Sequence, residues 1–192
     1  EMCIRDSPVT ISNDVVCSML AERFFGHGDK SMLFIKIDRG IGAATLIDDV
    51  TVIGQNHAGG EIGHISLDPE SGVLCPCGKR GCLETMVTSP VIRERIRRAS
   101  TPEEQLDIIR SCGEQLAAAL AMPIGLLDIN DICVYGPPDI VNAAFLEATQ
   151  RRVDMVSSSK FHKHTSVRRC QVGSDIALSL IHISEPTRHS LI

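Results

Sequence analysis

The chain has 192 residues, of which 43% are hydrophobic, and this is enough apolar material for one well-packed domain. Its net charge of −5 argues against a nucleic-acid-binding surface of its own, which would need a concentrated excess of lysine and arginine. Three of the eight cysteines cluster and the others are scattered, so we expect no secreted disulfide framework and a reducing, cytoplasmic location, without a transmembrane helix or a leader.

Both ends of the sequence resemble translated sequencing-adapter read-through: residues 1–7 read EMCIRDS, and residues 178–192 read LSLIHISEPTRHSLI. Segments of that kind are left out of reasoning about the fold. The alternative is that both are native peptide. On the first interpretation, we expect the genuine chain to run from about Pro8 to Ala177, as an internal fragment that lacks an N-terminal part and its last helix.

The first elements are a strand and a helix that follow each other directly. A short β-branched run predicts a buried strand at Val9–Ser12, and apolar residues at helical spacing predict a helix at Asp14–Phe25 that ends at Gly26. Asn13 and Asp14 would then lie where a strand ends and a helix begins, which is where open α/β sheets place ligands. The plain alternative for Asp14 is a helix N-cap.

Three strands in succession are predicted next: Met32–Ile37, Ala43–Ile47 and Thr51–Ile53. Gly40 and Gly42 lie in the predicted turn between the first two, where glycines can let backbone N–H groups approach a phosphate. A Gly-x-Gly turn is also common in plain hairpins, and the neighbouring Asp38 would repel an anion.

Helices and strands alternate through the rest of the chain. The predicted helices are Leu83–Val87, Pro90–Arg98, Thr101–Leu127 and about Ile140–Val156, and the predicted strands are Asp131–Tyr135 and Thr165–Val172. We expect Thr101–Leu127 to be a core helix, because its second half offers little polar surface, and we expect Pro123 to kink it. This alternation, together with the three successive strands, predicts an α/β domain.

The stretch from Glu61 to Glu84 holds one histidine and three cysteines within nineteen residues: His64, Cys75, Cys77 and Cys82. Zinc binds four such ligands tetrahedrally, and a set of three cysteines and one histidine leaves no position for water, so the site would be structural. The alternative is a disulfide with a spare thiol, although Cys75 and Cys77 are too close in sequence to bridge comfortably to each other. Ligand number and spacing favour zinc.

Four stretches of the sequence resemble the ROK family, which groups sugar kinases with sugar-responsive transcriptional repressors. They are S-N-D at 12–14, G-I-G-A at 40–43, A-G-G-E-I-G-H at 58–64 and C-P-C-G-K-R-G-C-L-E at 75–84. The resemblance covers about residues 8–177. It implies an actin-like, ribonuclease-H-like ATPase fold, so we expect an incomplete α/β lobe of that kind, with a zinc-stapled loop.

The resemblance also implies which residues bind sugar. Five would line a hexose pocket: Asn13, Asp14, Glu61, His64 and Glu84. In the family's kinases the aspartate at the position of Asp14 accepts the proton of the attacking sugar hydroxyl as general base, with ATP and Mg²⁺ as cofactors. Zinc held by His64 and the three cysteines would support the loop that carries Glu61 and Glu84, so sugar recognition would depend on the metal.

On the nucleotide side the sequence departs from the family pattern. Family kinases carry Gly-Thr-Gly ahead of the Ile-Gly, whereas this chain has Asp38-Arg39-Gly40. The strand on the adenosine side usually ends in consecutive glycines, whereas this one is followed by Gly136-Pro137-Pro138. Prolines remove N–H donors and fix φ, so this loop cannot wrap a nucleotide in the same way. The Asp-x-Gly-x-Thr phosphate motif is absent, which truncation would also explain.

Three hypotheses follow. The favoured one is the effector-binding part of a sugar-sensing transcriptional regulator, whose winged helix-turn-helix for operator DNA would precede Pro8 in the intact gene. The second is an ATP-dependent hexose kinase with an unusual phosphate loop. The third is a zinc-stapled α/β fragment without activity. The resemblance further implies a homo-oligomer at full length, since the family commonly dimerises.

Overall fold

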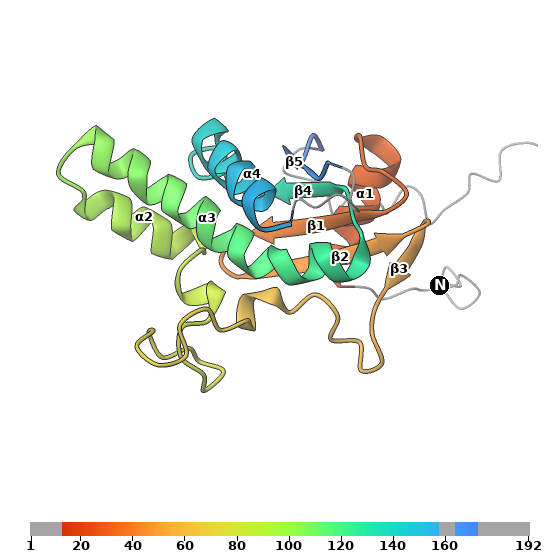
Figure 1. Ribbon diagram of the computed structural model, residues 1–192, viewed down its shortest axis with the longest axis horizontal. Coiled ribbons are helices and arrows are strands. Elements are labelled where there is room, and N and C mark those ends of the chain that lie inside the picture. The colour runs from red at the N-terminus through yellow and green to blue at the C-terminus, as the bar shows by residue number, and fades with distance from the viewer. Residues whose placement is uncertain (1–12, 158–163, 173–192) are drawn as a thin grey trace, which may run out of the picture.

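The computed structural model describes residues 13–157 and 164–172. Within them, five strands form one mixed sheet in the order β3-β2-β1-β4-β5, and helices cover both of its faces (Figure 1). The predicted α/β domain is therefore confirmed. The predicted strand at Val9–Ser12 and the adapter-like ends at 1–7 and 178–192 lie outside the described residues.

The strands are β1 Met32–Ile37, β2 Ile41–Ile47, β3 Val50–Val52, β4 Asp131–Tyr135 and β5 Ser166–Arg169. β1, β2 and β3 form an antiparallel meander, and β4 and β5 run parallel to β1. β2 begins two residues earlier than predicted, because Ile41 pairs with Ile37 and Gly42 with Lys36. The prediction that placed Gly42 in the turn was therefore wrong, and the turn is residues 38–40.

The helices are α1 Asp14–Phe25, α2 Ser89–Arg98, α3 Pro102–Leu127 and α4 Ala143–Ser157, with 3₁₀ turns η2 Ile62–His64 and η3 Leu83–Thr85. The helix predicted at Leu83–Val87 is wrong. Only a 3₁₀ turn forms there, since the Leu83 N–H donates across to the Ile65 carbonyl and α2 begins at Ser89. None of the helices that the structure describes combines the length and apolarity needed to cross a membrane.

Alternate residues of β1 point to opposite faces of the sheet. Leu33, Ile35 and Ile37 belong to the larger hydrophobic core, which α3 and α4 cover, and Phe34 belongs to the smaller core, which α1 covers (Figure 1). Lys36 has the same parity as Phe34, so its side chain lies on the α1 face of the sheet.

Helices α3 and α4 approach each other closely at Gly113. A Cβ atom on Gly113 would stand 2.5 Å from the Phe145 carbonyl oxygen of α4. The Thr149 hydroxyl donates to the Phe145 and Gly113 carbonyls at 2.8 and 3.2 Å, and so links the two backbones. A glycine at this position therefore sets how near the two helices lie.

Candidate functional site

The cysteine-rich loop follows β3 and lies beneath the sheet (Figure 1). Its first arm is fixed to β2, because the Ala43 N–H donates to the Gly60 carbonyl at 2.8 Å. Its two arms then run antiparallel: Ser66 and Cys82 form a β-bridge, and the Leu67 N–H donates to the Gly81 carbonyl at 2.8 Å. This pairing brings His64 and Cys82 side by side, although 18 positions separate them.

A tight turn places the three cysteines. The Gly78 N–H donates to the Cys75 carbonyl at 2.9 Å, and the Cys75 N–H donates to the Lys79 carbonyl at 2.8 Å. Gly78 and Gly81 adopt φ values of 90° and 63°, which glycine reaches without steric cost. The C-P-C-G-K-R-G-C sequence therefore folds back on itself and returns the last thiol to the first two.

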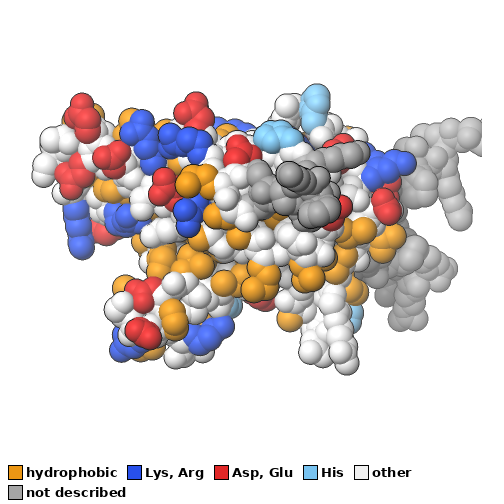
Figure 2. Space-filling view, viewed as in Figure 1, with side chains coloured by type: hydrophobic (Ala, Val, Ile, Leu, Met, Phe, Trp, Pro, Cys, Tyr) orange, Lys and Arg blue, Asp and Glu red, His pale blue; other side chains and the backbone are white. Residues whose placement is uncertain are grey.

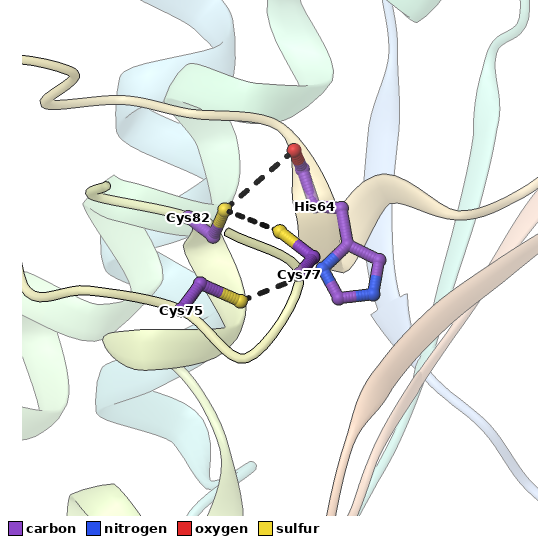
Figure 3. Close-up of side chains that lie close together, drawn as sticks. All are labelled: His64, Cys75, Cys77 and Cys82. Atoms are coloured by element: carbon purple, nitrogen blue, oxygen red, sulfur yellow. Dashed lines mark hydrogen bonds between the residues drawn. The ribbon is translucent and has the colours of Figure 1, made fainter. Parts of the chain in front are cut away.

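Four potential metal ligands meet at this turn. The Sγ atoms of Cys75, Cys77 and Cys82 and the Nδ1 atom of His64 all lie within 4.8 Å of one another (Figure 3). Cys77 Sγ lies 3.6 Å from Cys82 Sγ, and Cys75 Sγ lies 3.7 Å from His64 Nδ1. Ligands ~2.3 Å (sulfur) and ~2.0 Å (nitrogen) from a tetrahedral ion would be roughly 3.5–3.8 Å apart. These two separations are those expected around a four-coordinate metal, and the four cysteine and histidine donors are those that zinc prefers.

The thiols of the cluster differ in their acidity. The backbone N–H of Lys79 lowers the pKa of the exposed Cys77 thiol to about 7. Burial is the main cause that raises the pKa of Cys82 to about 11, and the hydrogen bond that the Cys82 thiol donates to Cys77 raises it further. Holding both as thiolates at neutral pH requires a nearby positive charge, which a bound divalent cation would supply.

His64 turns its two nitrogens to different surroundings. Nδ1 faces the thiols, whereas Nε2, on the other side of the ring, points away from them (Figure 3). The same ring can therefore bind a metal through Nδ1 and hydrogen-bond a ligand through Nε2, so its two predicted roles are compatible. Glu61 lies one turn earlier, at the N-cap of η2, with its side chain exposed.

Asn13 and Asp14 lie at the start of α1. The Asn13 side chain caps the helix by accepting a hydrogen bond from the Val15 N–H at 2.7 Å, so the alternative that made Asp14 the cap was wrong. Asp14 instead accepts a hydrogen bond from Lys36 Nζ, 2.7 Å from its Oδ2 atom. The sequence analysis missed Lys36, for which the available signal was a single lysine in an otherwise apolar strand.

A cavity of about 260 Å³ opens between α1 and the β1–β2 turn. It is lined by Asp14, Val15, Lys36, Asp38, Arg39, Gly40 and Gly42. Glu84 adjoins it, since its Oε2 atom lies 3.9 Å from where a Cβ atom on Gly40 would stand. The structure thus brings Asp14 and Glu84 to the same turn. It places Glu61 and His64 on the neighbouring loop.

A second cavity, of about 410 Å³, lies at the carboxyl ends of β1 and β4. It is lined by Ile37, Asp38, Tyr135, Gly136, Pro137, Pro138, Arg169, Cys170, Gln171 and Val172. Asp38 and the two prolines, which are a hundred positions apart in the sequence, therefore face one space. The prolines offer it no N–H groups, and the Pro137 carbonyl is engaged by the N–H groups of Ile140 and Val141.

The sequence profile of the ROK family matches residues 5–165. A glucokinase of Halalkalibacterium halodurans is 42% identical over 84 residues, which are 43% of this chain and 26% of the glucokinase. This chain therefore matches about a quarter of that relative's length.

Many solved structures share the fold, and two of them match this chain over most of its length. One is a ROK family transcriptional regulator, a homologue of the E. coli MLC protein, with a TM-score of 0.79 and 24% identity, over 92% of this chain and 52% of that one. The other is a ROK family glucokinase from Streptomyces griseus in complex with glucose and AMPPNP, with a TM-score of 0.76 and 23% identity, over 89% and 66%.

Proposed function

The chain belongs to the ROK family, and on this premise we propose that it is the sugar-binding effector part of a transcriptional regulator that senses a hexose. Operator DNA would be bound by another part of the intact protein. Sugar would act by preferring one of two states of the protein, because a ligand shifts an equilibrium only through its differential affinity for the two states.

The composition of the 410 Å³ cavity carries the proposal. Phosphoryl transfer needs a cradle of N–H donors and Mg²⁺ around the nucleotide phosphates. Here Asp38 contributes a carboxylate, and Pro137 and Pro138 contribute no N–H donors. Arg169 lines the same cavity, but its guanidinium group donates to the Gly136 carbonyl at 3.4 Å. Such a lining disfavours a triphosphate and supports ligand sensing without phosphoryl transfer.

The residues that we propose to bind sugar are polar and lie at one turn and the loop beside it. Asp14 and Glu84 adjoin one turn, and Glu61 and His64 belong to the loop that packs beside it. Carboxylate and imidazole groups suit a hydroxyl-rich ligand, since each fixes the direction of a hydrogen bond. We propose Asn13, Asp14, Glu61, His64 and Glu84 as the residues that bind the hexose.

The metal in this proposal is a structural zinc held by His64, Cys75, Cys77 and Cys82. The chemistry and spacing of the four donors support it. Its role would be to hold the two arms of the loop together, so that Glu61, His64 and Glu84 keep their places before sugar arrives. Preorganisation of this kind raises affinity by lowering the entropy lost on binding.

The charge distribution argues against DNA binding by α2 and α3. Over α2 and the first half of α3, basic side chains, all of them arginines, lie among Asp and Glu side chains on the face shown in Figure 2. Arg97 and Arg98 of α2 pair with Glu94, and Arg110 of α3 pairs with Asp107. Arginines paired within their own helix form a solvated face, and phosphate binding needs an excess of unpaired cations.

The second candidate is an ATP-dependent hexose kinase. The observation that favours it is the 42% identity with a glucokinase over 84 residues. In that case Asp14 would be the general base, and ATP with Mg²⁺ would have to bind despite Asp38 and the two prolines.

Calorimetric titration of the full-length gene product with hexoses and with ATP·Mg²⁺ tests the proposal. We expect a hexose to bind, ATP not to bind, and no phosphorylated sugar to form. Glu84→Gln should weaken sugar binding, whereas Glu103→Gln, an exposed change at the start of α3, should not. Formation of a sugar phosphate would establish the kinase and overturn the sensor.

A further inference from the structure

We propose that Cys77 is a site of oxidation by peroxide, that Cys82 captures the oxidised sulfur as a disulfide, and that this releases the metal of the cysteine-rich loop. The protein would then respond to oxidants as well as to sugar. Zinc binding at the loop is a premise here, whereas the identity of the sugar is not. Two observations point to this pair: the thiols of the cluster differ in exposure, and two of them are in contact.

Cys77 is the thiol that an oxidant reaches first. It is exposed, whereas Cys75 and Cys82 are buried. A peroxide molecule that arrives from solvent therefore meets the Cys77 sulfur before the other two. A sulfur bound to a divalent cation is already a thiolate, which is the form of cysteine that attacks peroxide.

Cys82 is the thiol placed to react with oxidised Cys77. Its Sγ atom lies 3.6 Å from Cys77 Sγ, and the two side chains point toward each other (Figure 3). A disulfide needs its sulfurs ~2.05 Å apart, so the pair has to close by roughly 1.5 Å. Cys75 is a poorer partner for Cys77, because two cysteines separated by one residue are too close in sequence to bridge comfortably.

The turn that carries Cys77 has room for this movement. No atom lies within 4 Å of where a Cβ atom on Gly78 would stand, so the backbone next to Cys77 borders open space. Cys82 is held more firmly, since it forms a β-bridge with Ser66 of the opposite arm. We therefore expect Cys77 to move toward Cys82.

The reaction with hydrogen peroxide has two steps. The Cys77 sulfur attacks one peroxide oxygen: an S–O bond forms, the O–O bond breaks, hydroxide leaves, and Cys77 becomes a sulfenic acid. The Cys82 sulfur then attacks the Cys77 sulfur: an S–S bond forms, the S–O bond breaks, and a second hydroxide leaves. Both hydroxides take up protons, from the thiols or from solvent, and become water. The two sulfurs thus give two electrons to peroxide.

The disulfide removes two of the four metal ligands. Only Cys75 and His64 would remain, whereas a structural zinc site is held by four protein ligands. We therefore expect the metal to leave when the disulfide forms.

A second pair of cysteines provides a comparison within the same chain. The Sγ atoms of Cys133 and Cys170 lie within 4.8 Å of each other, but both residues are buried. The Cys170 thiol also donates to Glu22 Oε2 at 3.1 Å, so its sulfur keeps a proton and is a weak nucleophile. This pair should stay reduced under conditions that oxidise Cys77 and Cys82.

The test is treatment of the full-length gene product, purified with its zinc, with hydrogen peroxide. A chromogenic chelator measures released zinc, N-ethylmaleimide blocks the remaining thiols, and mass spectrometry of peptides maps the disulfides. We expect loss of the bound zinc together with a disulfide between Cys77 and Cys82. Dithiothreitol with added zinc should restore both the thiols and the metal.

Two variants sharpen the test. Cys77→His keeps four ligands of kinds that zinc accepts but removes the exposed thiol, so peroxide should release its zinc about tenfold more slowly than in the wild type, or not at all. Cys17→Ser removes a thiol of α1 outside the cluster and should release zinc as the wild type does. If Cys77→His does not bind zinc, the disulfide map of the wild type decides.

Cys77 and Cys82 both remaining open to alkylation after peroxide treatment would overturn the inference. So would zinc that stays bound after the disulfide forms, zinc release from Cys77→His at the wild-type rate, or a disulfide found only between Cys133 and Cys170. An untreated protein without zinc would reject the metal assignment, and the inference with it. The sugar-sensing proposal stands or falls separately, by sugar binding to the reduced protein.

Discussion

The Arg168 guanidinium group donates from Nη1 to Glu22 Oε1 at 2.6 Å, although 146 positions separate the two residues. Its other nitrogens donate to Asp131 at 2.7 and 3.0 Å. Glu22 is fully buried on α1, and Asp131 begins β4. One cation from β5 therefore forms ion pairs with two buried carboxylates and links α1 to the edge strand of the sheet.

Removing that cation should be costly. Arg168→Met leaves Glu22 and Asp131 buried without their partner, so we expect a loss of ~3–5 kcal/mol in the free energy of unfolding. Arg110→Met, which breaks an exposed pair with Asp107, is the matched control and should cost no more than ~0.5 kcal/mol. Urea denaturation followed by circular dichroism measures both, and equal effects would contradict a special role for Arg168.

The same network predicts sensitivity to acid. Burial raises the pKa of Glu22, but hydrogen bonds from Arg168, Cys170 and two backbone N–H groups outweigh it and hold the pKa below its usual range. A carboxylate whose pKa is lower in the folded state stabilises the fold above its unfolded pKa of ~4.3 and loses that contribution as the pH falls. Stability should therefore fall below about pH 4, and it should fall less steeply in Glu22→Gln. Parallel profiles of the free energy of unfolding against pH, measured for the wild type and for Glu22→Gln, would refute this.

Two glycines of α3 should respond oppositely to the same change. Gly113→Ala places a methyl group against the Phe145 carbonyl, so we expect ~1–3 kcal/mol of destabilisation from overpacking. Gly125 is exposed and has no atom within 4 Å of the added Cβ, so Gly125→Ala should stabilise the helix by up to ~1 kcal/mol. Thermal melts check this prediction: the melting temperature should fall in Gly113→Ala and rise in Gly125→Ala.

The proposed metal site predicts one zinc ion per chain. Cys77→Ser removes one of four ligands and should abolish binding, whereas Cys17→Ser, in α1 and outside the cluster, should leave it unchanged. Elemental analysis of purified protein provides the count. Chelation should also loosen the loop from Glu61 to Glu84, which limited proteolysis would detect as new cleavage there. A wild-type protein without zinc would disprove the assignment.

Local patterns predict α1 and β1 to the residue, because their signals lie within the elements themselves. Asn13 and Gly26 delimit α1, and β1 is an apolar run that ends at a charged turn. Predictions fail where a distant partner decides the outcome. Ile41 and Gly42 join β2 only because Ile37 and Lys36 lie opposite them, and α4 starts later than predicted because the Ile140 and Val141 N–H groups bond to Pro137.

In the candidate site, too, some contacts could be predicted from the sequence and others could not. The spacing of His64, Cys75, Cys77 and Cys82 was sufficient to predict that they meet, since three of them share one short turn. The contact between Lys36 and Asp14 could not be predicted, because it depends on which face of the sheet α1 covers. The Arg168 network was equally hidden, since its members come from three elements far apart in the sequence.

The orientation of the His64 ring has a thermodynamic consequence. If one nitrogen binds the metal and the other the sugar, the two ligands share a single side chain, and the free energy that couples them is reciprocal. The factor by which zinc tightens sugar binding must equal the factor by which sugar tightens zinc binding. A cell in which this sugar is abundant would then also hold the protein's zinc more firmly against competing chelators.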